Sequence, residues 1–382
     1  MRGQGLTYVS ICAGCGFGSH GFDKAGWTGL AFVEHEDVRR AVLRKWHPKS
    51  ELFESIDGNL RLLSAGDLPA ADCWVVTVPC RSTSAAGKRR GLDDPNDLHR
   101  PFLRLFFEAA RIGRLPKWLV WENVDRWTGT RAARLTRKAL AQAGYSAAVG
   151  GNMNARAFGI PQDRARAFAI FAADASLLPL PIRTPLSYDP GLLDRTLIRD
   201  WPDRFVARDA PDGSAETRKR VAAFRRGLEH RERLAAEIPV FAGARRAPAE
   251  WNWDGFIWFM ALKNPTSVHV GYSQTLTKDP RLLVRLRDGR LTRATPEAHE
   301  WLMGMPEGYT AEGKGDGGER VVLTDPQRID ACGDGIVAPV MEAIALSLGC
   351  TGQEKKRRVG VVHGTKLRAS VGWSGRSDAQ VI

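Results

Sequence analysis

The sequence predicts an α/β protein whose main domain is a doubly wound, mostly parallel sheet, with a second, smaller domain beside it. Apolar, β-branched strand patterns alternate with helical patterns up to about residue 180, as they do in doubly wound sheets. The alternation stops at a proline-rich stretch, LLPLPIRTPLSYDPG (177–191). Such a stretch is typical of a boundary between domains.

The composition is that of a globular protein with a polyanionic partner. Of its 382 residues 43% are hydrophobic, enough for the cores of two domains. The formal net charge of +13 favours nucleic acid over a membrane surface as the partner. No apolar run reaches about 18 residues, and residues 1–10 lack the apolar core of a signal peptide. We therefore expect a cytoplasmic protein without a membrane span.

The first strand pattern, TYVSICA (7–13), leads into GCGFGSHG (14–21) and a second strand pattern, LAFVEHE (30–36). Glycines after a first strand let the backbone approach a ligand at a helix amino terminus. Their spacing follows the dinucleotide-binding fingerprint only loosely. Glu34 ends the second strand, where an acid can bind ribose hydroxyls. Taken alone, Glu34 is more simply a solvated charge.

A third strand pattern, WVVTV (74–78), is ended by Pro79 and followed by Cys80 and a loop rich in Ser, Ala, Gly, Lys and Arg. Ligands bind at the carboxyl ends of strands in open α/β sheets, and a thiol beside a basic loop suits nucleophilic work on an anionic substrate. A half-buried structural cysteine explains this stretch equally well.

A fourth strand pattern, WLVWENV (118–124), ends in Glu122 and Asn123. Glu122 is a second candidate for the active centre, and a surface glutamate at the start of a helix is the alternative. Helical spacing marks 38–46, 131–144, 215–237, 337–349 and the later part of 93–113, and 153–171 is typical of a β-hairpin. From Thr351 the chain is basic and poor in large apolar residues, which predicts a disordered tail.

Cys12 and Cys15 form a Cys-x-x-Cys pair within the six cysteines of the chain. A zinc site would need a second pair, or histidines at ligand spacing, and neither follows. A redox pair is an alternative, but the glycine-rich surroundings favour a ligand-binding loop. We predict no metal site.

Four motifs follow one another in a fixed order: AGCG (13–16), PCRSTSAAGKRRGLDDP (79–95), ENV (122–124) and NARAFGIPQDRAR (154–166). Together they resemble the C5-cytosine DNA methyltransferases, and TPEAHEWLMGMP (295–306) and GDGIVAPV (333–340) fit the same family. The resemblance implies a Rossmann-like catalytic domain at 1–180, completed by 325–350, that binds S-adenosylmethionine. It also implies a target-recognition domain at 181–324, before the tail at 351–382.

The resemblance implies a catalytic role for four residues. Cys80 would add to C6 of cytosine, and Glu122 would hold or protonate N3, so that C5 attacks the methyl group of S-adenosylmethionine. Arg166 would contact the base oxygen and Arg164 would support the site. The chemistry agrees, because C6 is a poor electrophile unless an acid polarises the ring for attack by a thiolate.

The resemblance also implies the residues that bind the cofactor and the DNA. Glu34 would bind the ribose, His35 would lie against adenine and Asn59 would lie near the adenine amino group. The other implied cofactor residues are Ala13, Gly14, Gly16, Pro79 and Asp334. The target base must leave the duplex, and a loop at 82–91 would close over the DNA. The implied DNA-binding residues are Arg81, Ser84, Lys88, Arg89 and Arg90.

Several residues depart from the family pattern without removing the nucleophile, the acid or the arginines. Arg81 replaces a glutamine and Thr83 a phenylalanine, and Asp334 stands where asparagine is usual. The first loop departs at Ser10, Cys12 and Phe17. A carboxylate at position 334 would face the carboxylate of the cofactor and weaken its binding unless a cation pairs with it.

These inferences predict a monomeric, site-specific DNA (cytosine-5)-methyltransferase that acts on double-stranded DNA. A cognate restriction endonuclease is a further candidate partner. One alternative is the same chemistry on RNA, since a branch of this family methylates transfer RNA. Another is a catalytically silent relative that only binds DNA. Trp251, Trp253 and Trp258 could read bases, but a core of the smaller domain is the favoured interpretation.

Overall fold

The computed structural model describes residues 5–79, 94, 96–178, 182, 184, 197–198, 200–205, 222, 258–261, 268–270, 272–278, 282–287 and 291–358. Some predictions lie outside these described residues. They are Cys80, the loop residues Arg81, Thr83, Ser84, Lys88, Arg89 and Arg90, two tryptophans (Trp251 and Trp253) and nearly all of the helix at 215–237.

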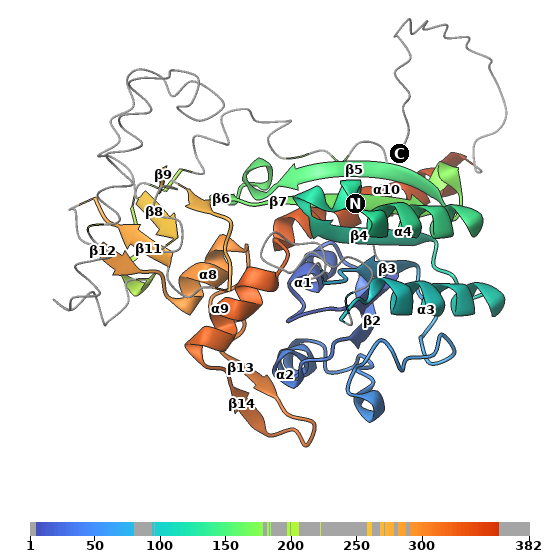
Figure 1. Ribbon diagram of the computed structural model, residues 1–382, viewed down its shortest axis with the longest axis horizontal. Helices are drawn as coiled ribbons and strands as arrows, with labels where there is room; N and C mark the ends of the chain where they lie inside the picture. The colour runs from blue at the N-terminus through green and yellow to red at the C-terminus, as the bar shows by residue number, and fades with distance from the viewer. Residues whose placement is uncertain are drawn as a thin grey trace, which may run out of the picture.

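The elements of the main sheet alternate between strands and helices (Figure 1). Its strands are β1 (Thr7–Ile11), β2 (Thr28–Val33), β3 (Cys73–Val76), β4 (Trp118–Val124), β5 (Ser146–Asn154) and β7 (Ala165–Ala172). The helices among them are α1 (Phe17–Lys24), α2 (Asp37–Trp46), α3 (His99–Arg111) and α4 (Arg131–Gln142). The short helix η1 (Glu54–Ile56) follows α2.

The six-stranded sheet has the order β2-β1-β3-β4-β7-β5. Strands β1, β2, β3 and β4 pair in parallel, and β7 runs antiparallel to both β4 and β5. The predicted doubly wound, mostly parallel sheet is thereby confirmed. A hairpin is formed by β5 and β7, but its first strand begins at Ser146, before the predicted range of 153–171. Strand β3 is buried along its whole length, as expected of a parallel strand covered on both faces.

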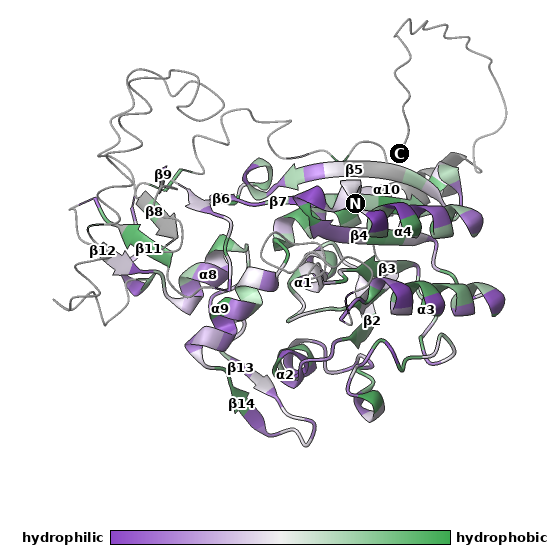
Figure 2. Ribbon diagram, viewed as in Figure 1, coloured by the Kyte–Doolittle hydropathy of each residue, from purple (hydrophilic) through white to green (hydrophobic). Residues whose placement is uncertain are grey.

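Both faces of the sheet are covered by apolar side chains of helices. On one face Tyr8, Phe22 and Trp118 belong to a core that includes residues of α1 and of α10 (Ala338–Arg358). On the other face Trp74 and Trp121 belong to a core that includes residues of α3 and α4. Figure 2 shows hydrophilic and hydrophobic residues alternating along α3 and α4, the pattern of helices with one buried face.

The last of the described helices, α10, packs against the first helix, α1. There, Trp27 Nε1 donates to the carbonyl of Ala345 (3.2 Å). A Cβ on Gly21 would lie 2.4 Å from the carbonyl oxygen of Ala338, so only glycine permits this approach. The helix predicted at 337–349 is confirmed, but it continues to Arg358. The prediction of a disordered tail is therefore wrong for 351–358, where Gln, Glu, Lys and Arg are good helix formers.

A second group of elements lies beside the carboxyl edge of the main sheet (Figure 1). Its four-stranded sheet has the order β12-β11-β8-β9, formed by β8 (Trp258–Ala261), β9 (Val268–Val270), β11 (Leu282–Arg285) and β12 (Leu291–Arg293). A pair of short strands, β6 (Gln162–Asp163) and β10 (Ser273–Gln274), joins it to the main sheet. The remaining elements are α8 (Pro296–Leu302), β13 (Glu312–Lys314), β14 (Arg320–Val322) and α9 (Asp325–Asp334).

Among the described residues no single helix is long and apolar enough to cross a membrane; only α9 and the first part of α10, joined across a 41° bend, would pass such a test together.

Candidate active site

One cavity of about 460 Å³ lies at the carboxyl ends of β1 to β4. It is lined at one end by Glu34 and at the other by Glu122. The structure brings most of the predicted site residues to this cavity: its lining includes Ala13, Gly14, Glu34, His35, Asn59, Pro79, Glu122, Arg166 and Asp334. A single cavity thus joins the predicted cofactor residues to the predicted acid.

The glycine turn after β1 forms one wall of the cavity. The backbone N–H of Ala13 donates to the carbonyl of Val33 (3.0 Å), which fastens the turn to β2. Gly16 does not line the cavity but begins α1 with a φ of 81°. A Cβ there would lie 2.9 Å from Cδ2 of Leu43. Gly16 is therefore required by the backbone of the turn and by its close packing.

Glu34 is not a solvated charge, because it is only 7% exposed. Its Oε2 accepts a hydrogen bond from the N–H of Gly14 (2.7 Å), and its Oε1 accepts one from the N–H of Glu36 (2.9 Å). The carboxylate therefore joins the end of β2 to the glycine turn. Each oxygen keeps a second lone pair, so the group can also accept hydrogen bonds from vicinal hydroxyls.

His35 and Asn59 lie on opposite segments at this end of the cavity. His35 is exposed, and its Nδ1 lies 3.4 Å from the carbonyl oxygen of Asp57. Asn59 is half-buried, and its Oδ1 accepts from the N–H of Arg61 (3.0 Å), which leaves the side-chain amide hydrogens available to a ligand. The two predicted adenine-site residues are therefore held by neighbouring backbone.

Glu122 lies within β4 and is 8% exposed, so it is not a surface glutamate at the start of a helix. Its Oε1 lies 3.5 Å from Nε of Arg166 on β7. Burial raises the pKa of Glu122, while the charges of Arg166 and Arg164 act to lower it. A carboxyl group with a raised pKa beside a cation can hold or donate a proton at a base nitrogen.

Asn123 was not singled out as a site residue, although it belongs to the ENV motif. Its Nδ2 donates to the carbonyl of Val78 (2.9 Å), and its side chain is buried. Val78 immediately precedes Pro79 and Cys80 in the sequence. Asn123 therefore fixes the end of the third strand segment to β4, beside Glu122.

Arg164 is 2% exposed and is committed to backbone carbonyls. Its Nη1 donates to Leu276 (2.9 Å), and its Nη2 donates to Gly333 (2.9 Å) and Gly335 (2.6 Å). Burial and the charge of Arg166 lower the pKa of Arg164 to about 9, at which it is still a cation at neutral pH. Arg164 thus joins the main sheet to the second group of elements and to the end of α9.

Asp334 is paired with cations that the sequence did not identify. Its Oδ2 lies 2.8 Å from Nη2 of Arg39 and 2.6 Å from Nζ of Lys278. Although burial acts in the opposite direction, Lys278 and Arg39 hold the pKa of Asp334 below its ordinary value. From the sequence, Asp334 was expected to weaken cofactor binding unless a cation pairs with it. The structure shows two such cations, Arg39 and Lys278.

The structure describes the side chains of four cysteines, and all have free thiols: Cys12, Cys15, Cys73 and Cys332. Burial raises the pKa of each, that of Cys15 to about 12. Thiols that stay protonated are poor nucleophiles and metal ligands. The described part of the chain holds no group of three or more His, Cys, Asp or Glu side chains suited to a metal ion.

A cavity at the carboxyl edge of such a sheet, with an acid at the end of its second strand, is that of an α/β enzyme with a nucleoside-bearing cofactor. A family model described as C-5 cytosine-specific DNA methylase matches residues 6–350. The chain therefore belongs to this family of DNA methyltransferases.

Relatives in sequence agree with this assignment, and solved structures share the fold. The chain is 33% identical to the Type II methyltransferase M.NgoPII of Neisseria gonorrhoeae, over 66% of this chain and 70% of that protein. It is 29% identical to M.FnuDI of Fusobacterium nucleatum, over 48% of this chain and 52% of the relative. The fold is similar to that of the Entamoeba histolytica methyltransferase EhMeth, with a TM-score of 0.57 and 13% identity over 90% of this chain and 97% of the other. Likewise, S. pombe Dnmt2 gives a TM-score of 0.53 and 15% identity, over 92% and 99%.

Proposed function

We propose that this protein is a site-specific DNA (cytosine-5)-methyltransferase that transfers the methyl group of S-adenosylmethionine to a flipped-out cytosine through a covalent Cys80 adduct. The observation that carries the proposal is the single cavity that runs from Glu34 to Glu122. A transfer reaction needs the donor and the acceptor in one enclosed space. The net charge of +13 supports a DNA substrate.

The lining of the cavity fits S-adenosylmethionine. Its volume, about 460 Å³, is in the usual range for ligand pockets. The Ser19 hydroxyl, in the cavity wall, is buried and has no hydrogen-bond partner among the described residues. A bound polar ligand would provide that partner. We propose that Glu34 binds the ribose, that His35 and Asn59 bind the adenine, and that Asp334 lies near the methionine part.

The chain's own residues then activate the cytosine. Glu122 holds or donates a proton at N3, which makes C6 electrophilic, and the Cys80 thiolate adds to C6. The electron pair of the ring now makes C5 nucleophilic. We propose that Arg166, whose Nε lies 3.5 Å from Oε1 of Glu122, contacts the base oxygen. When bound, S-adenosylmethionine supplies the electrophilic methyl group. Loss of the C5 proton then expels the Cys80 thiolate and restores the ring.

Trapping on a fluorinated base tests the catalytic proposal. With 5-fluorocytosine in the target DNA, no C5 proton can leave, so the Cys80 adduct should persist and survive denaturing electrophoresis. Bisulfite sequencing of host DNA after expression would first give the target site. No adduct with the wild-type protein on its methylated site would overturn the covalent mechanism. 5-Methylcytosine found only in RNA would overturn the choice of substrate.

We predict that Cys80→Ala abolishes methylation while DNA binding stays within about threefold of wild type, since the thiol acts only in bond formation. The measurement is transfer of labelled methyl groups to DNA, with a gel-shift assay for binding. Cys73→Ala is the matched control, because that thiol is buried in β3 away from the cavity. Turnover by the Cys80→Ala variant would refute the assigned nucleophile.

A further inference from the structure

We propose that Arg40 is a positioning residue for the nucleoside end of the cofactor site. It fixes two backbone segments of this end to each other and does not contact the cofactor. This inference rests on the proposed function for the identity of the ligand. It is carried by hydrogen bonds, burial and backbone geometry around the Arg40 guanidinium, on α2.

Arg40 joins the two segments that form this end of the cavity. Its Nη1 donates to the carbonyl oxygens of Glu34 (3.2 Å), His35 (2.7 Å) and Asp57 (2.9 Å). That nitrogen carries two hydrogens, so one of them is shared between two carbonyls. The first two carbonyls belong to the segment that ends β2. The third belongs to the loop that leads to Asn59 on the facing wall.

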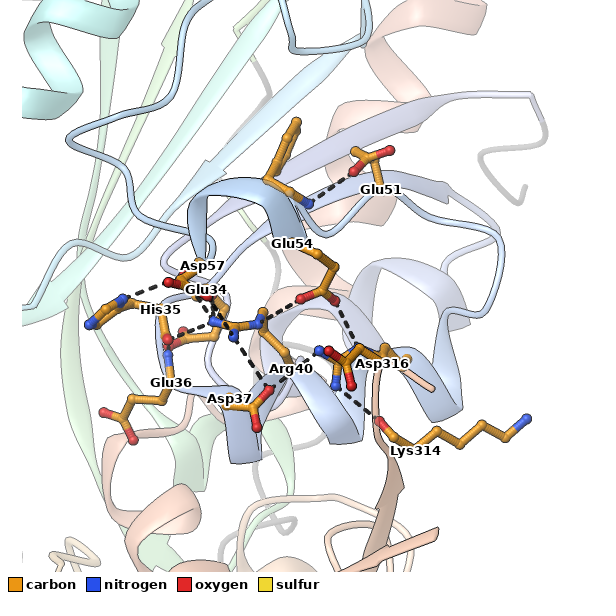
Figure 3. A network of polar contacts seen from close by, with 12 residues as sticks. Glu34, His35, Glu36, Asp37, Arg40, Glu51, Glu54, Asp57, Lys314 and Asp316 are labelled. Carbon is orange, nitrogen blue, oxygen red and sulfur yellow. Dashed lines mark hydrogen bonds and ion pairs between the residues drawn. The ribbon is translucent and has the colours of Figure 1, made fainter. Parts of the chain in front are cut away.

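The guanidinium is itself held firmly. Arg40 is 5% exposed, and Arg40 does not line the cavity. Its Nε lies 3.2 Å from Oε2 of Glu54, and its Nη2 lies 3.3 Å from Oδ1 of Asp37. Figure 3 shows Arg40 at the centre of these groups, with Glu34, His35 and Asp57 on one side and Glu54 on the other. The pair with Glu54 is an ion pair without hydrogen-bond geometry, since Nε has no hydrogen-bond partner among the described residues. The bonds to the three carbonyls therefore do most to orient the planar cation, and the carboxylates balance its charge.

The loop that Arg40 holds adopts an unfavourable backbone. Phe53 and Asp57 have φ values of 55° and 50°, in the left-handed region that side chains other than glycine rarely adopt. Gly58 follows with a φ of 58°, and a Cβ there would lie 1.9 Å from the carbonyl oxygen of Glu34. The loop therefore lies directly against the end of β2. Such a conformation persists only where its surroundings fix it, and Arg40 supplies a bond at Asp57.

The consequence concerns the relative position of the two segments at the nucleoside subsite. Glu34 and His35 on one segment, and Asn59 on the other, keep their relative positions because one planar cation bonds to both segments. Lysine does not replace it, because its side chain is one bond shorter, so its ammonium falls short of the position of Nη1, and the donors Nε and Nη2 are lost. Loss of Arg40 should therefore weaken cofactor binding and leave the cytosine end of the cavity intact.

The test is Arg40→Lys, with S-adenosylhomocysteine as the probe in isothermal titration calorimetry. We expect the Kd of the probe to rise about tenfold or more, because charge-assisted hydrogen bonds are lost. The KM for S-adenosylmethionine should rise in parallel. At saturating cofactor, kcat should stay within about twofold, because Glu122 and Arg166 are untouched. A lost kcat with unchanged Kd would overturn the proposal.

Arg44→Lys is the matched control on the same helix. Arg44 also pairs with Asp37 (3.3 Å) and Glu54 (2.8 Å), but it donates to the carbonyl of Lys314, which is not in the cavity wall. We expect it to lower the thermal midpoint as much as Arg40→Lys does, with an unchanged Kd. An equal rise in Kd for both variants would reduce Arg40 to a general stabilising role.

Glu54→Gln keeps the inference testable if Arg40→Lys does not fold. It removes a charge that balances the Arg40 cation without removing any donor, so a rise of about threefold in the Kd is expected. Wild-type affinity in Glu54→Gln, or in a folded Arg40→Lys, would overturn the inference. If the wild-type protein itself did not bind S-adenosylhomocysteine, the proposed function would fail instead.

Discussion

The two ends of the cavity differ in how firmly their acids are held. At the nucleoside end both oxygens of Glu34 accept backbone N–H groups, at 2.7 and 2.9 Å. At the cytosine end Glu122 lies 3.5 Å from Arg166, beyond the roughly 2.7–2.9 Å of a strong charge-assisted hydrogen bond. The first acid is part of a fixed binding surface. The carboxylate of Glu122 is buried beside Arg166, at a distance that leaves its oxygens able to accept further hydrogen bonds.

This difference indicates that the end of the cavity at Glu34 is organised before a ligand binds, whereas the end at Glu122 is not. A fixed nucleoside site lowers the cost of ordering on binding. Catalytic hydrogen bonds, in contrast, are often long without substrate and tighten only in the reacting complex. If the proposed function holds, the end of the cavity at Glu122 takes its final arrangement only when the base binds. Substitutions at the two ends should accordingly affect different measured quantities.

The largest expected effect is that of Glu122→Gln. The amide cannot supply a proton at N3, so kcat should fall by about 10²- to 10⁴-fold, while the Kd of S-adenosylhomocysteine stays unchanged. Because burial raises the pKa of Glu122, more of the protonated form is present near neutral pH, and wild-type activity should fall as pH rises through that pKa. The variant should lack this alkaline limb in single-turnover rates measured across pH. A large change in the Kd of S-adenosylhomocysteine in Glu122→Gln would contradict the conclusion that the two ends of the cavity act separately.

The next effect is on stability, from Arg164→Met. The carbonyls of buried Leu276 and of the partly buried Gly333 and Gly335 would lose a charged donor, which should cost about 3 kcal/mol or more in the free energy of unfolding. Arg166→Met is the comparison, because Arg166 donates to one carbonyl, that of Ala165, and about 1 kcal/mol is expected there. Urea denaturation measures both. An equal loss of unfolding free energy in the two variants would contradict the interpretation that Arg164 is structural and Arg166 faces the base.

The smallest effect is expected from Asp334→Asn. Arg39 and Lys278 pair with Asp330 as well as with Asp334, and Arg39 also pairs with Glu36. Removal of the Asp334 carboxylate therefore makes the charge near the methionine part of the cofactor less negative. The KM for S-adenosylmethionine should therefore fall, by no more than about threefold for such partly exposed charges. Initial-rate kinetics at saturating DNA would show it, with Asp330→Asn as control. A rise in KM would mean that Asp334 binds the cofactor directly.

Local patterns were sufficient to predict the strands and the residues at their ends. An apolar run followed by an acid placed Glu34 and Glu122 at one edge of the sheet, and the structure puts both in one cavity. The glycine turn could be predicted for the same reason. Whether these acids were solvated depended on packing, which the pattern of the strands alone did not reveal.

Partners distant in the sequence could not be predicted in this way. Arg39 and Asp334 are 295 positions apart, and Lys278 approaches from the second group of elements. Arg40 stood in a helix rich in charge, where a solvated side chain is the usual outcome. Its burial depends on a loop with left-handed residues that no periodicity indicates.

The return of the carboxyl-terminal segment to the first helix has a consequence during synthesis. The cavity wall at Gly333, Asp334 and Ile336 is made about 300 positions after the glycine turn. At about 5–20 residues per second, the ribosome needs roughly 15–60 s between the two. Until then the first half of the site has no opposite wall, so a nascent chain cannot enclose cofactor. Methylation can thus begin only after nearly all of the described residues have been translated.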